Sequence, residues 1–254
     1  MQTLKNILAR IWAFWGLVTF IVTFLIFFIP SMLCYVIPGN KGQKLFIDLS
    51  RYWMNIWLPL VGCPLKVYGY ENFKKNTAYI VTCNHNAFLD VPISAPYTPG
   101  PNKTIAKNSF AKIPLFGWYY KKGSVLVDRK NERSRLHSFD EMKKVLKAGM
   151  NMCIFPEGTR NRTKEPLKQF YDGAFKLAEV TKNPIIPALI FNTRKAMPID
   201  KTFYFWPHKL YMHFLPPVEV DNLKSKELRD KVFEIMKNHY LKYENNPQEK
   251  PTYQ

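Results

Sequence analysis

The sequence predicts an α/β fold with a mostly parallel, mixed sheet that is flanked by helices and preceded by a hydrophobic two-helix module. Three observations predict it: short apolar runs punctuated by Gly, Pro and Asn, stretches of helical periodicity between these runs, and an uncharged N-terminal segment. Strands that alternate with helices usually pair in parallel, so the order of elements favours a layered α/β domain. The chain of 254 residues suffices for one globular domain with an appendage.

The N-terminal segment has no charged side chain from Ile11 to Asn40. Its first part, Ile11 to Ile29, has the roughly 20 residues that a helix needs to cross a bilayer, and Pro30 is expected to kink or end this helix. A second apolar stretch, Tyr52 to Leu65, is too short to span but rich in Trp and Tyr. We expect a helical pair inserted into one leaflet. A single spanning helix is the alternative, and a buried core helix fits less well.

Seven apolar runs are predicted to form strands, and three periodic stretches are predicted to form helices. The strands are expected at 65–69, 78–84, 103–107, 124–128, 152–156, 184–191 and 210–220. The helices are expected at 132–150, 172–182 and 225–243. Pro187 predicts an edge strand or a bulge because proline cannot donate to a ladder. The chain divides into membrane-associating helices at 1–64, an α/β domain at 65–244 and a polar, disordered tail at 245–254.

The chain is strongly basic, with a net charge of +18 and a pI near 9.7. Such a surface attracts nucleic acid, anionic lipid or a phosphorylated substrate. Basic and aromatic residues interleave from Ala106 to Lys130, which suits lipid headgroups or single-stranded nucleic acid. The hydrophobic N-terminus favours lipid, and no nucleic-acid-binding motif is found.

The cysteines show neither paired CxxC spacing nor zinc-site spacing with the histidines. The four residues are Cys34, Cys63, Cys83 and Cys153. We interpret them as buried small apolar residues in a reducing compartment. Cys83 is a minor candidate nucleophile because it lies close to His85.

The stretch VTCNHNAFLD, at 81–90, places His85 just after a predicted strand and Asp90 five residues later. Functional loops of such sheets lie at the carboxyl ends of the strands. In an ideal helix the two side chains would be roughly 140° apart, so pairing requires His85 in a turn and Asp90 in the first helical turn. Asp90 could then fix the imidazole tautomer and leave the other nitrogen as a base. Alternatively, Asn84 or Asn86 caps the helix and His85 has no catalytic role.

A second cluster of polar residues lies in CIFPEGTRNR at 153–162. A strand ends here at Pro156 and presents Glu157, Gly158, Thr159, Arg160 and Arg162. Glycine lets the backbone approach a ligand, Arg160 can grip a phosphate with several N–H groups, and Glu157 can accept a hydrogen bond from a hydroxyl. The alternative is a tight turn with a solvated arginine.

Four motifs in this order resemble the glycerophospholipid acyltransferase family, and most closely its bacterial 1-acylglycerol-3-phosphate branch. They are NHNAFLD at 84–90, KIPLFGW leading to GSVLVDR at 123–129, FPEGTR at 155–160 and, more loosely, IIPAL around Pro187. The resemblance covers roughly residues 65 to 220. It implies transfer of a fatty acyl group from acyl-CoA or acyl-ACP to the sn-2 hydroxyl of lysophosphatidate, which gives phosphatidate.

The resemblance also implies a role for each site residue. His85 would be the general base and Asp90 would orient it. Glu157, Gly158 and Thr159 would bind the acceptor, and Arg160 with Lys107 would hold its phosphate. No metal or cofactor is implied beyond the acyl thioester co-substrate.

The implied partners are an anionic lipid bilayer, a lysophospholipid and an acyl thioester, with the acyl carrier protein as one candidate donor and no nucleic acid. The implied location is the cytoplasmic face of the inner membrane. Two alternatives stay open. One is an acyltransferase of the same family that acts on another acceptor, such as a lyso-ornithine lipid or another lysophospholipid. The other is a non-catalytic membrane-binding protein.

Overall fold

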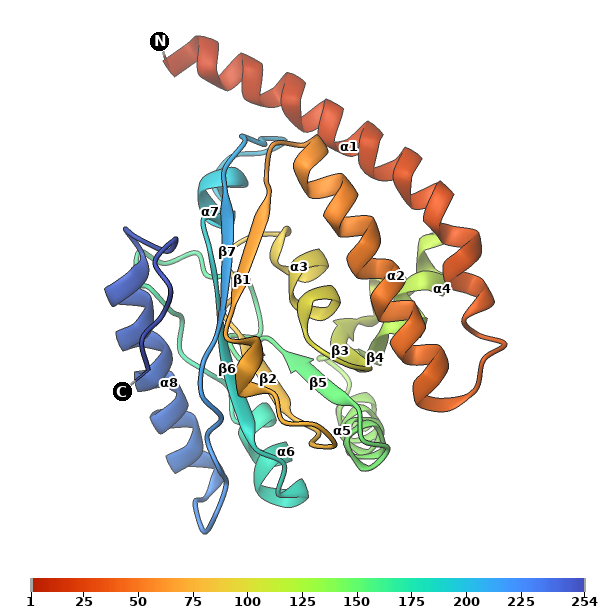
Figure 1. Cartoon of the computed structure of the whole chain (residues 1–254), viewed down its shortest axis with the longest axis vertical. Helices are drawn as coiled ribbons and strands as arrows, with labels where there is room; N and C mark the ends of the chain where they lie inside the picture. Colours follow the sequence, from red (N-terminus) through yellow and green to blue (C-terminus); the bar gives the residue numbers. More distant parts are fainter. Residues whose placement is uncertain (1, 254) are drawn as a thin grey trace.

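The computed structural model describes residues 2–253 and shows a seven-stranded sheet between two layers of helices (Figure 1). The strand order is β1-β7-β6-β2-β5-β3-β4. Neighbouring strands are parallel except β6 and β7, which are antiparallel. The predicted fold class, a mostly parallel mixed sheet flanked by helices, is therefore confirmed.

The seven strands and helices α5, α6 and α8 follow the predicted order along the chain, whereas α4 and α7 were not predicted and α2 begins before the second apolar stretch. The strands are β1 (Leu65–Tyr68), β2 (Ile80–Cys83), β3 (Asn102–Lys107), β4 (Ser124–Val127), β5 (Asn151–Ile154), β6 (Ile185–Phe191) and β7 (Leu210–Phe214). The helices are α1 (Gln2–Leu33), α2 (Gly39–Leu60), α3 (Asp90–Tyr97), α4 (Phe116–Gly123), α5 (Glu132–Lys147), α6 (Gly173–Thr181), α7 (Thr193–Ala196) and α8 (Ser225–Tyr243). Two 3₁₀ turns, η1 (Tyr70–Asn72) and η2 (Asn108–Lys112), complete the set. The last predicted strand is shorter than expected, because beyond Phe214 only an isolated bridge joins Val218 to Ile185.

The N-terminal helices form a hairpin whose inner face packs on the sheet layer. Indole N–H groups fasten the two helices together: Trp53 donates to Thr23 Oγ1 (2.8 Å) and Trp57 to the Gly16 carbonyl (3.3 Å). The expectation that Pro30 ends the first helix is wrong, because α1 continues to Leu33; Pro30 lies in its last turn, where little helix remains to be disrupted. Within residues 2–253, α1 is the one helix long and apolar enough to cross a membrane.

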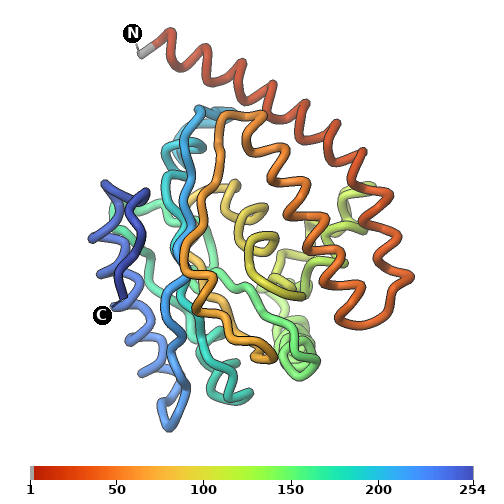
Figure 2. Tube along the Cα trace, in the orientation of Figure 1, coloured from red at the N-terminus to blue at the C-terminus, as the bar shows by residue number. Residues whose placement is uncertain are grey.

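The two faces of the sheet carry different layers (Figures 1 and 2). Helices α1, α2 and α3 cover one face and share a core with it, which includes Trp57, Ile93 and Val81. Helices α5, α6 and α8 cover the other face, where Phe175 and Met236 are fully buried. The loops after β2, β5 and β6 leave the carboxyl edge between these two layers. The hydrophobic helices α1 and α2 and the helix α8 therefore lie on opposite sides of this edge.

The expectation of an edge strand or bulge at Pro187 is wrong. Pro187 lies in β6, which is paired on both sides, with β2 and with β7. The antiparallel ladder with β7 begins only at Ala188, and the Pro187 carbonyl accepts from the Leu215 N–H (2.8 Å) just beyond the end of β7. The missing N–H thus falls where the ladder has not yet begun, which is why an inner strand tolerates proline here.

The expectation of a disordered tail at 245–254 does not hold for residues 245–253. Their sequence is polar, but Pro247 and Pro251 are buried. Tyr253 donates its hydroxyl to the Phe214 carbonyl (2.6 Å), and His213 Nε2 contacts the Pro247 carbonyl (2.9 Å). The segment is therefore held against α8 and the β1–β7 edge by hydrogen bonds that sequence composition does not reveal. Residue 254 lies outside the described residues.

Candidate active site

The turn after β2 is fixed to the neighbouring strand by Asn84. Its side-chain amide donates to the Ile190 carbonyl (3.0 Å) and accepts from the Ile190 N–H (2.7 Å). This fully buried side chain thus continues the pairing of β2 with β6 after β2 has ended. Asn84 does not cap α3, and no side chain makes an N-terminal capping bond to that helix. The backbone that leads into the next residue, His85, is consequently held in a fixed position.

His85 and Asp90 are brought together, as the family resemblance implies, with His85 in a turn and Asp90 in the first helical turn. Asp90 is the first residue of α3 and is fully buried, and its Oδ2 lies 2.9 Å from His85 Nδ1. The same oxygen accepts the backbone N–H groups of Asn86 (2.6 Å) and Ala87 (2.7 Å). A carboxylate that receives several donors in a buried turn has little rotational freedom. Asp90 therefore fixes both the turn and the ring.

The imidazole of His85 is oriented on two sides. Because Asp90 is an acceptor, we assign the Nδ1 proton to this bond, which leaves a lone pair on Nε2. The ring stacks on Phe155, with centroids 4.4 Å apart and planes inclined by 28°. The side chain keeps 15% exposure, so a substrate can reach it. This geometry suits a base that accepts a proton at Nε2.

Glu157 clamps the backbone of the same turn. It is fully buried; Oε1 accepts from the His85 N–H (2.7 Å) and Oε2 from the Lys168 N–H (2.9 Å). On the other side of the residue, the Asn161 N–H donates to the His85 carbonyl (2.6 Å). Burial raises the Glu157 pKa to about 7, although these backbone donors oppose the shift. We expected Glu157 to contact the acceptor, but its partners in the structure are backbone groups, so it positions His85.

Gly158 and Thr159 complete the turn after β5. Gly158 has φ +70°, and an added Cβ would lie 2.7 Å from the Tyr171 ring, so both conformation and space require glycine. Its carbonyl accepts from the Arg129 guanidinium. Thr159 is exposed, and its Oγ1 accepts from Lys168 Nζ (2.9 Å). The loop is thus tied internally as well as to the His85 turn.

Arg160 and Lys107, the two predicted phosphate ligands, differ in their surroundings. The Arg160 guanidinium lies over the Phe88 ring, 3.6 Å from its centroid, and Phe88 itself is 60% exposed. Partial burial and the nearby Arg162 lower the Arg160 pKa. Lys107 is exposed at the carboxyl end of β3, two strands from β2. The structure therefore brings Arg160 to the turn, whereas Lys107 lies at the same edge without a contact to His85 or Asp90.

Three residues that secure the site were not among the predicted site residues. Arg129 belongs to the second motif, which was a usable signal for its bond to the Gly158 carbonyl. Asn161 and Lys168 bind the His85 carbonyl and Glu157 through backbone N–H groups, for which the side-chain pattern gives no signal. Lys168 adds the side-chain bond to Thr159. Long-range backbone contacts of this kind emerge only from the fold.

The cysteines offer no nucleophile to this site. All four are free and buried. Burial raises the pKa of Cys83 well above its ordinary value, and the charge of Asp90 adds to the shift, which opposes formation of a thiolate. Among residues 2–253 no group of three or more His, Cys, Asp or Glu side chains is arranged to hold a metal ion.

Known proteins with similar sequences are acyltransferases. A 1-acyl-sn-glycerol-3-phosphate acyltransferase of Borreliella burgdorferi is 30% identical over 201 residues, which cover 78% of this chain and 79% of the relative. One of Saccharomyces cerevisiae is 28% identical over 219 residues, 82% of this chain and 71% of the relative. One of Salmonella typhimurium is 29% identical over 220 residues, 84% of this chain and 85% of the relative.

A solved structure and a family model complete the comparison. The crystal structure of the 1-acyl-sn-glycerophosphate acyltransferase of Thermotoga maritima superposes with a TM-score of 0.79, covers 97% of this chain and 99% of its own, and is 22% identical. At that identity the match shows a shared fold. The acyltransferase family model matches residues 64–191, a span that includes every predicted site residue. The chain therefore belongs to the acyltransferase family, as its motifs predicted.

Proposed function

We propose that this acyltransferase moves a fatty acyl group from an acyl thioester to the sn-2 hydroxyl of lysophosphatidate and so makes phosphatidate. The observation that carries the proposal is the His85–Asp90 pair, held in a turn clamped by Glu157. The lysophosphatidate acceptor is supported by the names of the relatives, which act on 1-acyl-sn-glycerol-3-phosphate. The acyl donor is acyl-CoA or acyl-ACP, since both present the same thioester.

The proposed reaction is a direct transfer. Nε2 of His85 takes the proton of the acceptor hydroxyl as its oxygen attacks the thioester carbonyl. The tetrahedral intermediate collapses, the C–S bond breaks, and the thiolate leaves with the proton that His85 held. Asp90 stabilises the imidazolium formed in between. Acyl ester and free thiol are the products, and no acyl-enzyme is formed.

Acceptor binding is assigned to the loop after β5. Arg160 has a planar set of N–H groups that matches a phosphate, and its stacking on Phe88 fixes the plane of the guanidinium. Lys107 is a weaker phosphate ligand because it is exposed and lies two strands away. Thr159 and Gly158 border the same loop. We propose no metal or cofactor besides the thioester co-substrate.

We also propose that the α1–α2 hairpin lies in one leaflet of the membrane. Helix α1 has 32 residues and is about 48 Å long. It is tethered at both ends: its Ala9 carbonyl accepts from the Phe205 N–H (3.1 Å), and just beyond its other end Tyr35 donates to the Trp118 carbonyl (2.8 Å). A helix fixed to the domain at both ends lies along it rather than projecting through a bilayer.

The outer face of this hairpin is apolar and exposed. Its most exposed side chains include Leu4, Ile11, Phe14, Ile26, Ile29 and Leu33, each at 59% or more. Trp118 on α4 extends the same apolar region. Such a face suits insertion into a leaflet, and the net charge of +18 adds attraction to anionic lipids. The cytoplasmic face of the inner membrane, where acyl thioesters are available, is the location we propose.

The test is acyl transfer by the purified, detergent-solubilised protein from a labelled acyl thioester. Lysophosphatidate, lyso-ornithine lipid and lysophosphatidylcholine are offered side by side, with coenzyme A and carrier-protein donors. Preference for lysophosphatidate supports the proposal. Transfer to another acceptor would contradict the proposed acceptor while retaining the family chemistry, and no transfer with either donor would favour a binding role.

A further inference from the structure

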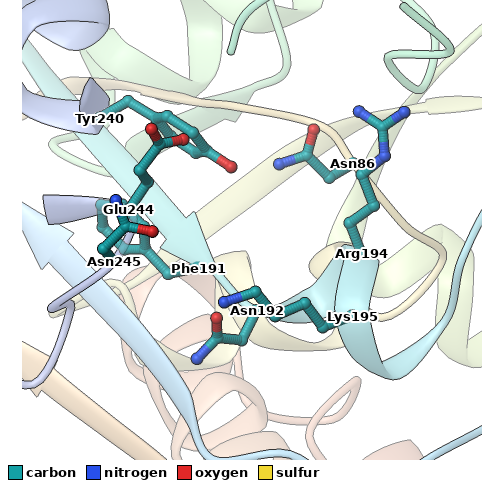
Figure 3. A pocket seen from close by; sticks show the side chains of 8 residues that line it. All are labelled: Asn86, Phe191, Asn192, Arg194, Lys195, Tyr240, Glu244 and Asn245. Carbon is teal, nitrogen blue, oxygen red and sulfur yellow. The ribbon is translucent and has the colours of Figure 1, made fainter. Parts of the chain in front are cut away.

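A polar pocket opens beside the catalytic turn, on the side of the sheet that carries α8 (Figure 3). Its volume is about 200 Å³. Its polar lining comprises Asn86, Asn192, Arg194, Lys195, Tyr240, Glu244 and Asn245. Asn86 follows His85 directly, so the pocket shares a wall with the turn that carries the base. None of these side chains has a role in the function proposed above.

The wall of the pocket is built from fixed parts. The Tyr240 ring stacks on the buried Phe191, with centroids 5.3 Å apart and planes inclined by 20°. Figure 3 shows the Tyr240 hydroxyl pointing toward Asn86 across the pocket. Arg194 donates one N–H to the Thr163 carbonyl (2.9 Å), which holds the guanidinium in place and leaves its other N–H groups available.

The charge of the pocket favours an anion. Arg194 and Lys195 supply two positive charges against the single carboxylate of Glu244. Lys195 is exposed, and its ammonium group has no hydrogen-bond or ion-pair partner in the part of the chain that the structure describes. The Asn86 amide adds a neutral donor, and the Asn192 amide, which already donates one N–H to the Lys209 carbonyl (2.9 Å), retains a second N–H. A planar arginine, a free lysine and amide groups together are the set that recognises phosphate.

The position of the pocket separates it from the acceptor site. Arg160 and Phe88 lie on the loops after β5 and β2, and the exposed Phe88 stands between Ala87 and Leu89, which belong to the core shared with the hydrophobic helices. The pocket lies toward α8, on the other side of the sheet. A lysolipid arrives from the leaflet, whereas a water-soluble donor arrives from solvent. The two substrates therefore have separate approaches to His85.

We propose that this pocket holds the phosphate at the end of the pantetheine arm of the acyl donor. The inference rests on the proposed function, because it assigns the second substrate of that reaction. A phosphopantetheine thioester carries this phosphate whether the arm is attached to a nucleotide or to a carrier protein.

The first test is a charge reversal, Lys195→Glu, with Lys226→Glu as the matched control. Both lysines are exposed, and Lys226 lies in the first turn of α8, at the end remote from the pocket. Lys195→Glu is expected to raise KM about tenfold for both palmitoyl-CoA and palmitoyl carrier protein, since a charge-assisted contact is replaced by repulsion. KM for lysophosphatidate should stay unchanged in both variants.

Three outcomes of this test would overturn the inference. Unchanged donor KM values would remove the pocket from donor binding. A rise in the lysophosphatidate KM would assign the pocket to the acceptor. An effect confined to palmitoyl-CoA would place the nucleotide phosphates there instead, because the carrier protein has none. Failure of the proposed function itself would look different, since the parent protein would not acylate lysophosphatidate at all.

A binding measurement without turnover keeps the proposal testable. Unacylated 4′-phosphopantetheine is expected to bind the parent protein about tenfold more tightly than pantetheine, which lacks the phosphate. In Lys195→Glu this difference should disappear, and in Lys226→Glu it should persist. Equal affinities of the two compounds for the parent protein would overturn the proposal, and so would a difference that Lys195→Glu retains.

Discussion

The catalytic turn and the basic side chains around it are built in opposite ways. The turn depends on fully buried carboxylates, Asp90 and Glu157, which accept hydrogen bonds from backbone N–H groups and from the imidazole. The basic side chains, Arg160 and Lys107, are at least partly exposed and make few bonds within the protein. The difference indicates that the geometry of the base is fixed before substrate arrives, whereas the phosphate ligands complete their contacts only with substrate.

Asp90→Asn should give the largest effect among the variants that retain His85. The amide can present an N–H to His85 Nδ1 and so favour the wrong tautomer of the imidazole. It is also a weaker acceptor than the Asp90 carboxylate oxygen, which receives three donors in the parent protein. We expect kcat to fall by about 10² to 10⁴ with little change in either KM. Steady-state kinetics checks this, with Asp140→Asn, an exposed aspartate on α5, as the control. An unchanged kcat would show that the pairing has no catalytic role.

Glu157→Gln should have a smaller effect on the same turn. Glutamine has one acceptor oxygen, so its amide N–H₂ would face the backbone N–H of His85 or of Lys168. We expect kcat to fall about ten- to hundredfold and the free energy of unfolding to fall by about 1–3 kcal/mol. Kinetics and denaturant unfolding in detergent measure the two effects. Loss of substrate affinity without loss of kcat would instead indicate that Glu157 contacts the acceptor.

The pH dependence of the free energy of unfolding tests the contribution of the Glu157 charge separately from that of its side-chain shape. Its pKa is raised from 4.5 to about 7, so in that interval the folded protein keeps a proton that the unfolded chain has released. The free energy of unfolding should therefore decrease as pH rises through this interval, by up to about 3 kcal/mol, and level off above it. This slope should be absent in Glu157→Gln. A slope that persists in the variant would assign it to another group.

Arg160→Ala tests the exposed half of the comparison. Loss of a charge-assisted contact should raise KM for lysophosphatidate about tenfold and leave kcat nearly unchanged, because Arg160 does not hold the turn. Arg133→Ala, an exposed arginine on α5, is the control. A fall in kcat would instead place Arg160 among the residues that fix the geometry of the base before substrate binds. An unchanged KM would remove Arg160 from the phosphate site.

Lys107→Ala should give the smallest effect. The side chain is exposed and two strands from the base, so its interaction with a phosphate is screened by water. We expect KM for lysophosphatidate to change by less than about threefold. A tenfold rise, measured in the same assay, would mean that Lys107 moves into the site when substrate binds.

The sequence was sufficient for the fold and for the central pair. Short apolar runs between helical stretches placed every strand of the sheet, and the signal is strongest for β2, β5 and β6, whose residues are all buried. Pairing of His85 with Asp90 required a turn followed by a helix, and the structure shows that arrangement. Both predictions depend on patterns that extend over only a few neighbouring residues.

The sequence was not sufficient where the decisive contacts are distant along the chain. Glu157 meets the His85 N–H across 72 residues, and Arg129 meets the Gly158 carbonyl across 29. Pro187 predicted an edge strand because the sequence does not reveal where a neighbouring ladder begins. The polar tail was expected to be disordered, yet Tyr253 and Pro247 find backbone and histidine partners on β7. Such outcomes depend on tertiary neighbours rather than on composition.

The most direct test of the central claim is turnover by His85→Ala. Acyl transfer from labelled palmitoyl thioester to lysophosphatidate is measured for the parent protein, for His85→Ala and for His137→Ala, an exposed histidine on α5. Removal of the base should lower kcat by at least about 10² to 10⁴ while binding to anionic vesicles is retained, and His137→Ala should match the parent. Comparable turnover by His85→Ala and the parent would contradict the assignment of His85 as the general base.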